Sequence, residues 1–138
     1  MKLTFEGLIS NDLVSHAHET LSTKELLTYY IDDTTGWLAL EKYIKTSDGL
    51  FNTNGIINTY NVGHTLLEKS FIRDTFKAID LIIDLDFEEM SHNNGSMIDI
   101  YHVNYSSDFE EDVIGQALAQ SSSSGSWWDI FWKDSPLI

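Results

Sequence analysis

The chain contains no cysteine, which leaves its redox compartment undefined and excludes metal sites built from thiolates. Basic residues are also scarce: 8 lysines and arginines stand against 22 acidic residues, for a formal net charge of -14. Because this excess would repel phosphates and anionic lipids, we expect no nucleic-acid partner. No apolar run reaches the roughly 20 residues of a membrane span, and the first residues lack the apolar stretch of a signal peptide. We expect no membrane insertion, while the localisation stays open and includes an extracellular or virion-associated one.

The residues that are present favour a folded protein. Apolar residues make up 42% of the 138 positions and aromatic residues 12%, which is too much hydrophobicity for a disordered chain. The length corresponds to one ordinary domain. We expect an irregular N-terminal region over residues 1–60 with a possible first strand, joined to a helix and sheet over residues 61–138.

A single strong helix signal lies in the middle of the chain. Thr65 and Glu68 form a capping box, in which each side chain satisfies a free backbone N–H at a helix start. Apolar residues then recur at steps of three and four, which is typical of an amphipathic helix packed on a core. The pattern predicts a helix over residues 65–83, and the apolar positions are Leu67, Phe71, Ile72, Phe76, Ile79, Ile82 and Ile83.

Strand patterns follow this helix. Residues 85–90 alternate apolar and acidic side chains, which predicts a strand covered on one face. Residues 97–103 predict a second strand, and we favour a strand for 113–120, where Gly115 lies between apolar neighbours. Residues 120–126 have the composition of a flexible linker. They lead to a segment of β-forming aromatic residues, which predicts a last strand.

The part of the chain before the helix is less regular. Residues 22–31 fit either a helix started by Ser22 and Glu25 or a strand over the second half of the segment, and we favour the strand. The Asn- and Gly-rich stretch 49–63 predicts loops with short extended pieces.

The order and spacing of these segments resemble the first half of a serralysin-type zinc protease of the metzincin superfamily. That family follows a long helix with strands of the types I-T-F-x-E and A-D-I-x-F, an edge strand, and a strand of the type D-I-W-F-N. The resemblance implies an α/β fold with a twisted, mostly parallel sheet of about five strands and one long packed helix, as in the upper subdomain of the family. It covers about residues 26–134, and the matching segments are 85–90, 97–103, 113–120 and 129–132.

Two topologies compete at the turn SHNNGS. Its Asn-Gly pair is typical of a hairpin between antiparallel strands. The resemblance implies instead that the strands before and after the turn run parallel, with the first strand of the sheet between them. We favour the second arrangement because a right-handed crossover also accounts for the long helix.

The zinc motif of the family, H-E-x-x-H-x-x-G-x-x-H, is missing. In the family it lies on a helix just after the last strand, where the histidines hold the metal and the glutamate activates a bound water. Here KDSPLI follows Trp132, and no residue matches a catalytic position. For this chain alone we therefore expect no enzyme activity, no cofactor and no metal ion.

Histidines and carboxylates offer weaker candidates. His16 and His18 in SHAHET would share one face of a strand, but we interpret them as surface residues because no third ligand is in view. His64, His92 and His102 are isolated in sequence. Two acidic groups lack the glycine-bearing turn of a calcium loop and are interpreted as solvated faces. They are Asp84, Asp86, Glu88 and Glu89, and then Asp108, Glu110, Glu111 and Asp112.

Two segments are candidate interaction sites. In the resembled family the strand that matches 113–120 borders the substrate cleft, where an extended peptide adds itself as a further strand. The aromatic segment would there pack partly against the zinc helix, so here we expect it to cover its own sheet or another protein. The candidate residues are Val113, Ile114, Gln116, Leu118, Trp127, Trp128, Phe131 and Trp132.

These expectations combine into a non-catalytic structural or protein-interaction module derived from a serralysin-like half-domain. It would belong to a larger assembly, such as a virion, tail or surface complex, with a protein partner or as a homo-oligomer. Two alternatives stay open. One is the N-terminal part of a split or truncated zinc protease whose zinc helix comes from a second polypeptide, and the other is a peptide-binding module that uses its edge strand.

Overall fold

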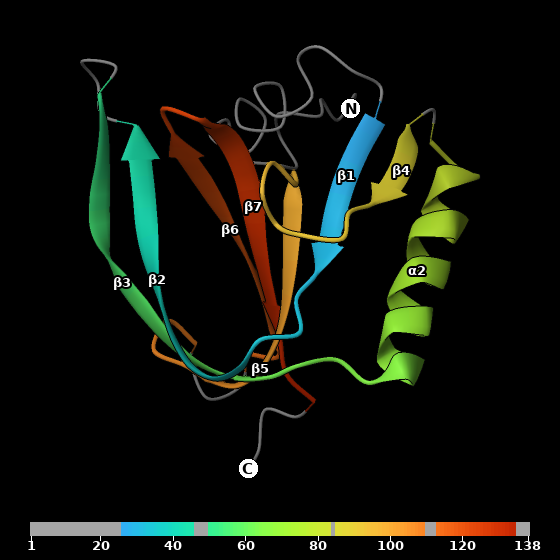
Figure 1. The fold of residues 1–138 in the computed structure, drawn as a ribbon, viewed down its shortest axis with the longest axis horizontal. Helices are drawn as coiled ribbons and strands as arrows, with labels where there is room; N and C mark the ends of the chain where they lie inside the picture. The colour runs from blue at the N-terminus through green and yellow to red at the C-terminus, as the bar shows by residue number, and fades with distance from the viewer. Residues whose placement is uncertain (1–25, 46–49, 84, 110–112, 135–138) are drawn as a thin grey trace, which may run out of the picture.

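A computed structural model describes residues 26–45, 50–83, 85–109 and 113–134 of the chain (Figure 1). The histidines of the SHAHET segment lie outside these residues. The described part holds seven strands and one helix. In chain order they are β1 Leu26–Ile31, β2 Thr35–Lys45, β3 Phe51–Val62, α2 Leu66–Asp80, β4 Asp86–Glu89, β5 Ile98–Ser106, β6 Gly115–Ser122 and β7 Gly125–Trp132.

Strand β5 is the centre of the sheet. It runs parallel to β1 on one edge and parallel to β7 on the other. Beyond the end of β1, strand β3 pairs antiparallel with the second half of β5 and carries β2 as its antiparallel neighbour. Strand β4 lies outside β1, and β6 pairs antiparallel with β7.

The expected α/β fold with a mostly parallel sheet of about five strands is wrong. The described part of the chain is mostly β, and its seven strands form a mixed, largely antiparallel sheet with one helix. The expectation failed mainly at residues 49–63, where Asn and Gly indicated loops but β3 pairs with β2 along most of its length. Residues 120–126 are not a linker either, because they form the ends of β6 and β7 and the tight turn between them.

Strand β1 lies where the favoured topology puts the first strand, and the segment SHNNGS does not form a hairpin between antiparallel strands. Strand β1 lies between β4 and β5 and is parallel to both, so this prediction is confirmed. The connection from β4 to β5 crosses over β1. Its first residue, Met90, donates its backbone N–H to the carbonyl of Tyr29, and Met97 donates to the carbonyl of Thr28.

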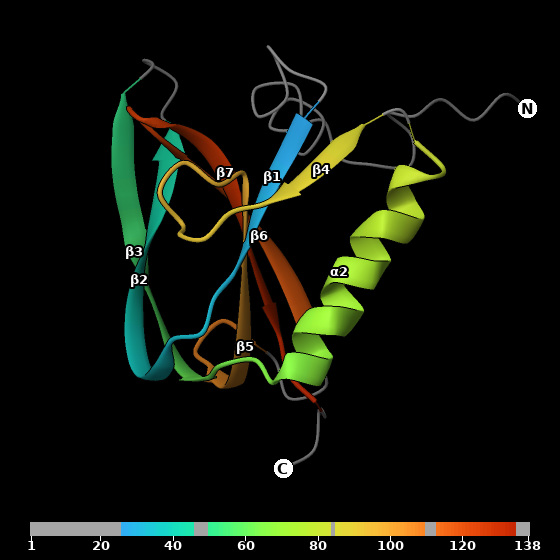
Figure 2. The same cartoon turned by 45° about the vertical axis from the view of Figure 1, so that its right-hand side comes forward.

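The two faces of the sheet carry separate cores. On the face toward α2, Tyr29, Ile31 and Ile100 are buried, and the partly buried Phe76 of the helix packs against them. On the opposite face the β2–β3 hairpin closes over a second cluster, which consists of Tyr101, Val103 and Phe131 with Leu38, Leu40, Phe109 and Leu118 packed against it. Figures 1 and 2 show the helix beside β1 and β4, on the other side of the molecule from the hairpin.

Helix α2 begins where the sequence predicts. The Thr65 hydroxyl accepts from the backbone N–H of Glu68, and a Glu68 carboxylate oxygen accepts from the backbone N–H of Thr65, which completes the capping box. The helix ends at Asp80, three residues before the predicted end. None of its residues is fully buried, although its apolar positions follow the spacing of a packed helix.

Candidate functional site

The predicted interaction residues lie on β6, on β7 and just before β6. Strand β6 pairs with β7 along its whole length and with no other described strand, so it is an edge strand of the described sheet. The face of β6 toward the hairpin is tied to β2, because the Gln120 side chain bonds to the β2 backbone at Glu41 and Tyr43. Ile114 is exposed, whereas Val113, Gln116 and Leu118 are partly buried.

The aromatic residues of β7 face both sides of the sheet. Trp127 and Phe131 point to the face that the hairpin covers, and Phe131 is fully buried there. By the same alternation Trp128 and Trp132 belong to the face of α2. The aromatic segment thus packs on its own sheet on both faces, and the α2 face leads to the site described next.

A cluster of polar and aromatic side chains surrounds the start of α2. The imidazoles of His64 and His102 lie with their centroids 5.7 Å apart, one at the helix start and the other on β5. Trp132 at the end of β7 donates its indole N–H to Nε2 of His64 over 2.9 Å. His64 Nδ1 lies 2.6 Å from the backbone carbonyl of Asp32, which accepts its proton. Burial lowers the pKa of His64, which favours the neutral ring that this pair of hydrogen bonds requires.

His102 is held between two carboxylates. Its Nδ1 lies 2.8 Å from the carbonyl of Gly63 and must donate there, because a carbonyl only accepts. Its Nε2 faces a carboxylate oxygen of Asp134 at 3.4 Å, and a Glu68 oxygen lies 3.6 Å from Nδ1. The two carboxylates give the ring a negative electrostatic environment, which attracts cations.

Glu68, His102 and Asp134 are also the described groups that are close enough together to share a metal ion. One ligand atom from each lies within 4.8 Å of the other two. The hydrogen bond from Nδ1 to Gly63 fixes the ring as it does in many metal-bound histidines. Burial alone would raise the pKa of Glu68, but its hydrogen bonds from Thr65 and the nearby histidines lower it overall, so this carboxylate is ionised and available.

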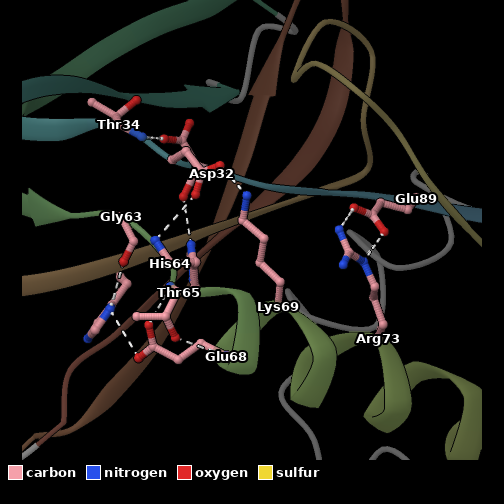
Figure 3. Close-up of polar contacts among 11 residues, drawn as sticks. Asp32, Thr34, Gly63, His64, Thr65, Glu68, Lys69, Arg73 and Glu89 are labelled. Atoms are coloured by element: carbon pink, nitrogen blue, oxygen red, sulfur yellow. Dashed lines mark hydrogen bonds and ion pairs between the residues drawn. The ribbon is translucent and has the colours of Figure 1, made fainter.

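Two cations of α2 pair with carboxylates at the ends of the neighbouring strands. Lys69 forms an ion pair with Asp33 after β1, and Arg73 binds Glu89 of β4 through two nitrogens at 2.6 and 2.8 Å (Figure 3). Together with Phe76, which stacks on Tyr29 at 4.1 Å, these contacts hold the helix over β1 and β4. Within the described residues, α2 covers the same side of β5 and β7 only in part.

An apolar groove with a volume of about 490 Å³ lies between α2 and these two strands. We call it the helix-side groove. Its walls are apolar except at one end, where Glu68 joins the groove to the histidine cluster. The lining residues are Leu67, Glu68, Phe71, Ile72, Ile100, Ile130 and Trp132.

Sequence reasoning found Trp132 but missed most of this site. His64 and His102 are 38 positions apart and have no motif spacing, so only the sheet brings them together. The exposed apolar side of α2 gave a usable signal, since Leu67 and Phe71 belong to a predicted packing face. In the structure these two residues are 81% and 73% exposed.

Comparison of the chain with protein-family models, with curated proteins and with solved structures finds no match. The resemblance to serralysin-like proteases therefore stays a prediction, and any function has to be argued from the groove and its surroundings. In the described part of the chain, no helix has the length and hydrophobicity to cross a membrane.

Proposed function

We propose that this protein is an interaction module that binds a basic amphipathic helix of a partner polypeptide in the helix-side groove. The observation that carries the proposal is the half-covered α2 face of the sheet. Helix α2 packs over β1 and β4, and its Leu67 and Phe71 form an apolar groove with the strand residues Ile130 and Trp132 that no described side chain occupies.

The groove fits a helix better than an extended strand. Its walls are side chains of a helix and of the sheet face, so the backbone of a guest finds no strand edge to pair with there. A helix satisfies its own backbone groups and offers apolar residues along one side. A second helix beside α2 would bury the exposed Leu67 and Phe71 and complete the burial of Ile130 and Trp132 on β7.

The charges around the groove favour a basic guest. Of the described residues that line the groove, Glu68 alone is charged. The Asp134 carboxylate lies close to it, on the other side of His102. The nearby cations Lys69 and Arg73 are occupied by Asp33 and Glu89. With a net charge of -14, the protein also attracts cationic partners at long range.

A designed peptide tests the proposal. The probe is a fluorescent peptide of leucine and lysine, about 18 residues or five helical turns long, with its leucines on one face. The control peptide has the same composition in scrambled order. We expect the amphipathic peptide to bind and the scrambled one to bind about tenfold more weakly or worse, measured by fluorescence anisotropy.

Protein variants locate the binding. Leu67→Asp and Phe71→Asp each place a carboxylate in the groove at an exposed position, and we expect each to weaken binding about tenfold. Ile56→Asp on β3 adds the same charge at another exposed apolar position and should leave binding unchanged. Equal effects of all three variants would contradict the proposal. A second result would also contradict it: the wild-type protein is a dimer that does not bind the peptide, and the two groove variants are monomers. A second copy of the chain would then occupy the groove.

The split-protease alternative uses the same groove. It is favoured by one observation, the position of Trp132 at the end of β7 in the groove wall, because in the resembled family the zinc helix follows the matching strand. A guest helix that carries H-E-x-x-H would then bind in the groove and bring zinc with it. A complex with one zinc ion for each pair of chains, absent for a guest with both histidines replaced, would support this alternative.

A further inference from the structure

A second concave site lies on the opposite face of the sheet. This cleft has a volume of about 810 Å³ and lies between β2, the connection from β4 to β5, and the turn from β6 to β7. Its lining includes Tyr43, Asp99, Tyr101, Trp127 and Asp129, together with amide and hydroxyl side chains. The α2 face and its groove lie on the other side of the sheet, so the cleft is a separate site.

Two buried carboxyl groups form part of the cleft wall. Asp99 on β5 and Asp129 on β7 are register partners in parallel strands and face the same side. Because neighbouring strands lie about 4.8 Å apart, the two groups are side by side. They are 6% and 3% exposed. Asp129 accepts from the Gln120 amide at 3.0 Å and from the Trp127 indole at 3.2 Å, so its two oxygens are each supplied with a donor.

Asp99 is less well supplied. Its Oδ1 accepts from the hydroxyl of Ser96, which also lies 3.0 Å from the carbonyl of Asn93. No described residue donates to its other oxygen, Oδ2. A bound group with N–H donors could therefore supply the hydrogen bond that Oδ2 lacks. Burial raises the pKa of Asp99 to about 7; the hydrogen bond from Ser96 acts in the opposite direction, and the charge of Asp129 adds to the rise.

The other walls of the cleft favour a cation. The rings of Tyr43 and Trp127 lie with their centroids 5.7 Å apart and present aromatic surface to the cleft. None of the described residues lining it is lysine, arginine or histidine, whereas Glu41 adds a third carboxylate. Aromatic faces and carboxylates both attract an organic cation, and the carboxylates repel an anion.

We propose that this cleft binds an organic ammonium group, with Asp99 accepting its N–H donors and the rings of Tyr43 and Trp127 forming the aromatic wall. The ammonium supplies the hydrogen bonds that Asp99 lacks, and it balances a pair of buried charges that no described cation of the cleft offsets. Free amines and lysine side chains share this chemistry. Neither depends on the helix-side groove, so this proposal stands or falls independently of the proposed function.

Calorimetric titration with small amines tests the site. The probes are putrescine for a free amine and Nα-acetyl-lysine amide for a lysine side chain, with the Nε-acetylated form of the second probe as its neutral match. We expect at least one amine to bind the wild-type chain and the neutral match to bind at least tenfold more weakly. Tighter binding of putrescine identifies a free amine as the ligand, and tighter binding of the lysine probe identifies a polypeptide side chain.

Two variants with the same change of charge separate the cleft from the general attraction of an acidic protein. Asp99→Asn keeps the shape of the side chain and removes its charge in the cleft, and we expect it to weaken amine binding at least tenfold. Asp86→Asn removes an exposed charge on β4 and should leave binding unchanged. Equal weakening by both variants, or no amine binding at all, would overturn the proposal. Binding of maltose in place of the amines would overturn it too, because the cleft would then be a site for neutral sugars.

Discussion

The imidazole of His102 lies flat on the indole of Trp132, with the ring centroids 3.8 Å apart and the planes 1° from parallel. Trp132 also donates to His64, which in turn donates to the carbonyl of Asp32. This chain of contacts joins the end of β7, the start of α2 and the end of β1. It fixes one end of the helix-side groove.

Removing the stacked ring should destabilise the protein. His102→Ala loses the stack on Trp132 and leaves the Gly63 carbonyl without its donor, so we expect the free energy of unfolding to fall by about 2 kcal/mol. His92→Ala is the matched control, because His92 is exposed in the turn after β4 and should change stability by less than about 0.5 kcal/mol. Urea unfolding measures both. Equal losses for the two variants would mean that the stack contributes nothing.

Replacing either of two glutamines on the same face of β6 by leucine should change the stability of the protein in opposite directions. Gln120 bonds to the β2 backbone and to Asp129, so Gln120→Leu leaves several buried groups unsatisfied and should cost about 3 kcal/mol. The side-chain oxygen of Gln116 is buried and has no partner in the described part of the chain. Gln116→Leu should therefore be neutral or stabilising. Thermal unfolding of the two variants checks this, and the reverse ranking would contradict it.

Local patterns predicted the helix and several of the strands, whereas the site depends on pairing over long distances. The capping box and apolar spacing located the start of α2, and alternation found β4. Nothing local joins His64 to His102 or Asp99 to Asp129, because each pair meets only through the order of strands in the sheet. The β2–β3 hairpin was missed because the Asn-rich β3 has weak β propensity and is held by its partners β2 and β5.

The capping box makes a stability prediction of its own. Thr65→Ala removes the hydroxyl that accepts from the backbone N–H of Glu68, and we expect a loss of about 1 kcal/mol. Thr75→Ala is the control, because Thr75 is an exposed residue within the helix whose hydroxyl donates to the Phe71 carbonyl. Alanine favours a helix interior, so this variant should be neutral or slightly stabilising. Chemical denaturation of both variants measures the difference.

The protein should lose stability as the pH rises from about 4 to about 7. Burial raises the pKa of Asp99 to about 7 and that of Asp129 to about 6, from a usual value of 3.8. Across this range the folded state binds more protons than the unfolded state, so the free energy of unfolding falls with rising pH, and the loss is complete above about pH 7. The lowered pKa of His64 opposes this trend below its usual value of 6.5, but it is one group against two. The lowered pKa values of Asp33, Glu68 and Glu89 reduce stability only at more acidic pH.

Asp99→Asn should remove much of this dependence. The amide cannot ionise, so the variant should unfold at a higher temperature than the wild type at about pH 8 and should lose less stability between about pH 5 and 7. Asp86→Asn is the control for the change in net charge. Melting temperatures measured across the pH range decide the matter. A wild-type protein that gains stability from pH 5 to 7 would contradict the buried, proton-holding carboxyl pair.

Nuclear magnetic resonance of isoleucine methyl groups tests the central claim, the docking of a helix in the groove, most directly. The groove is lined by Ile72, Ile100 and Ile130, whereas Ile57 is buried on β3 and Ile56 is exposed beside it. On titration with the amphipathic leucine and lysine peptide, we predict shifts of the three groove methyl groups and constant signals from the two on β3. Shifts confined to the β3 isoleucines, or the absence of any shift at a saturating peptide concentration, would contradict the account.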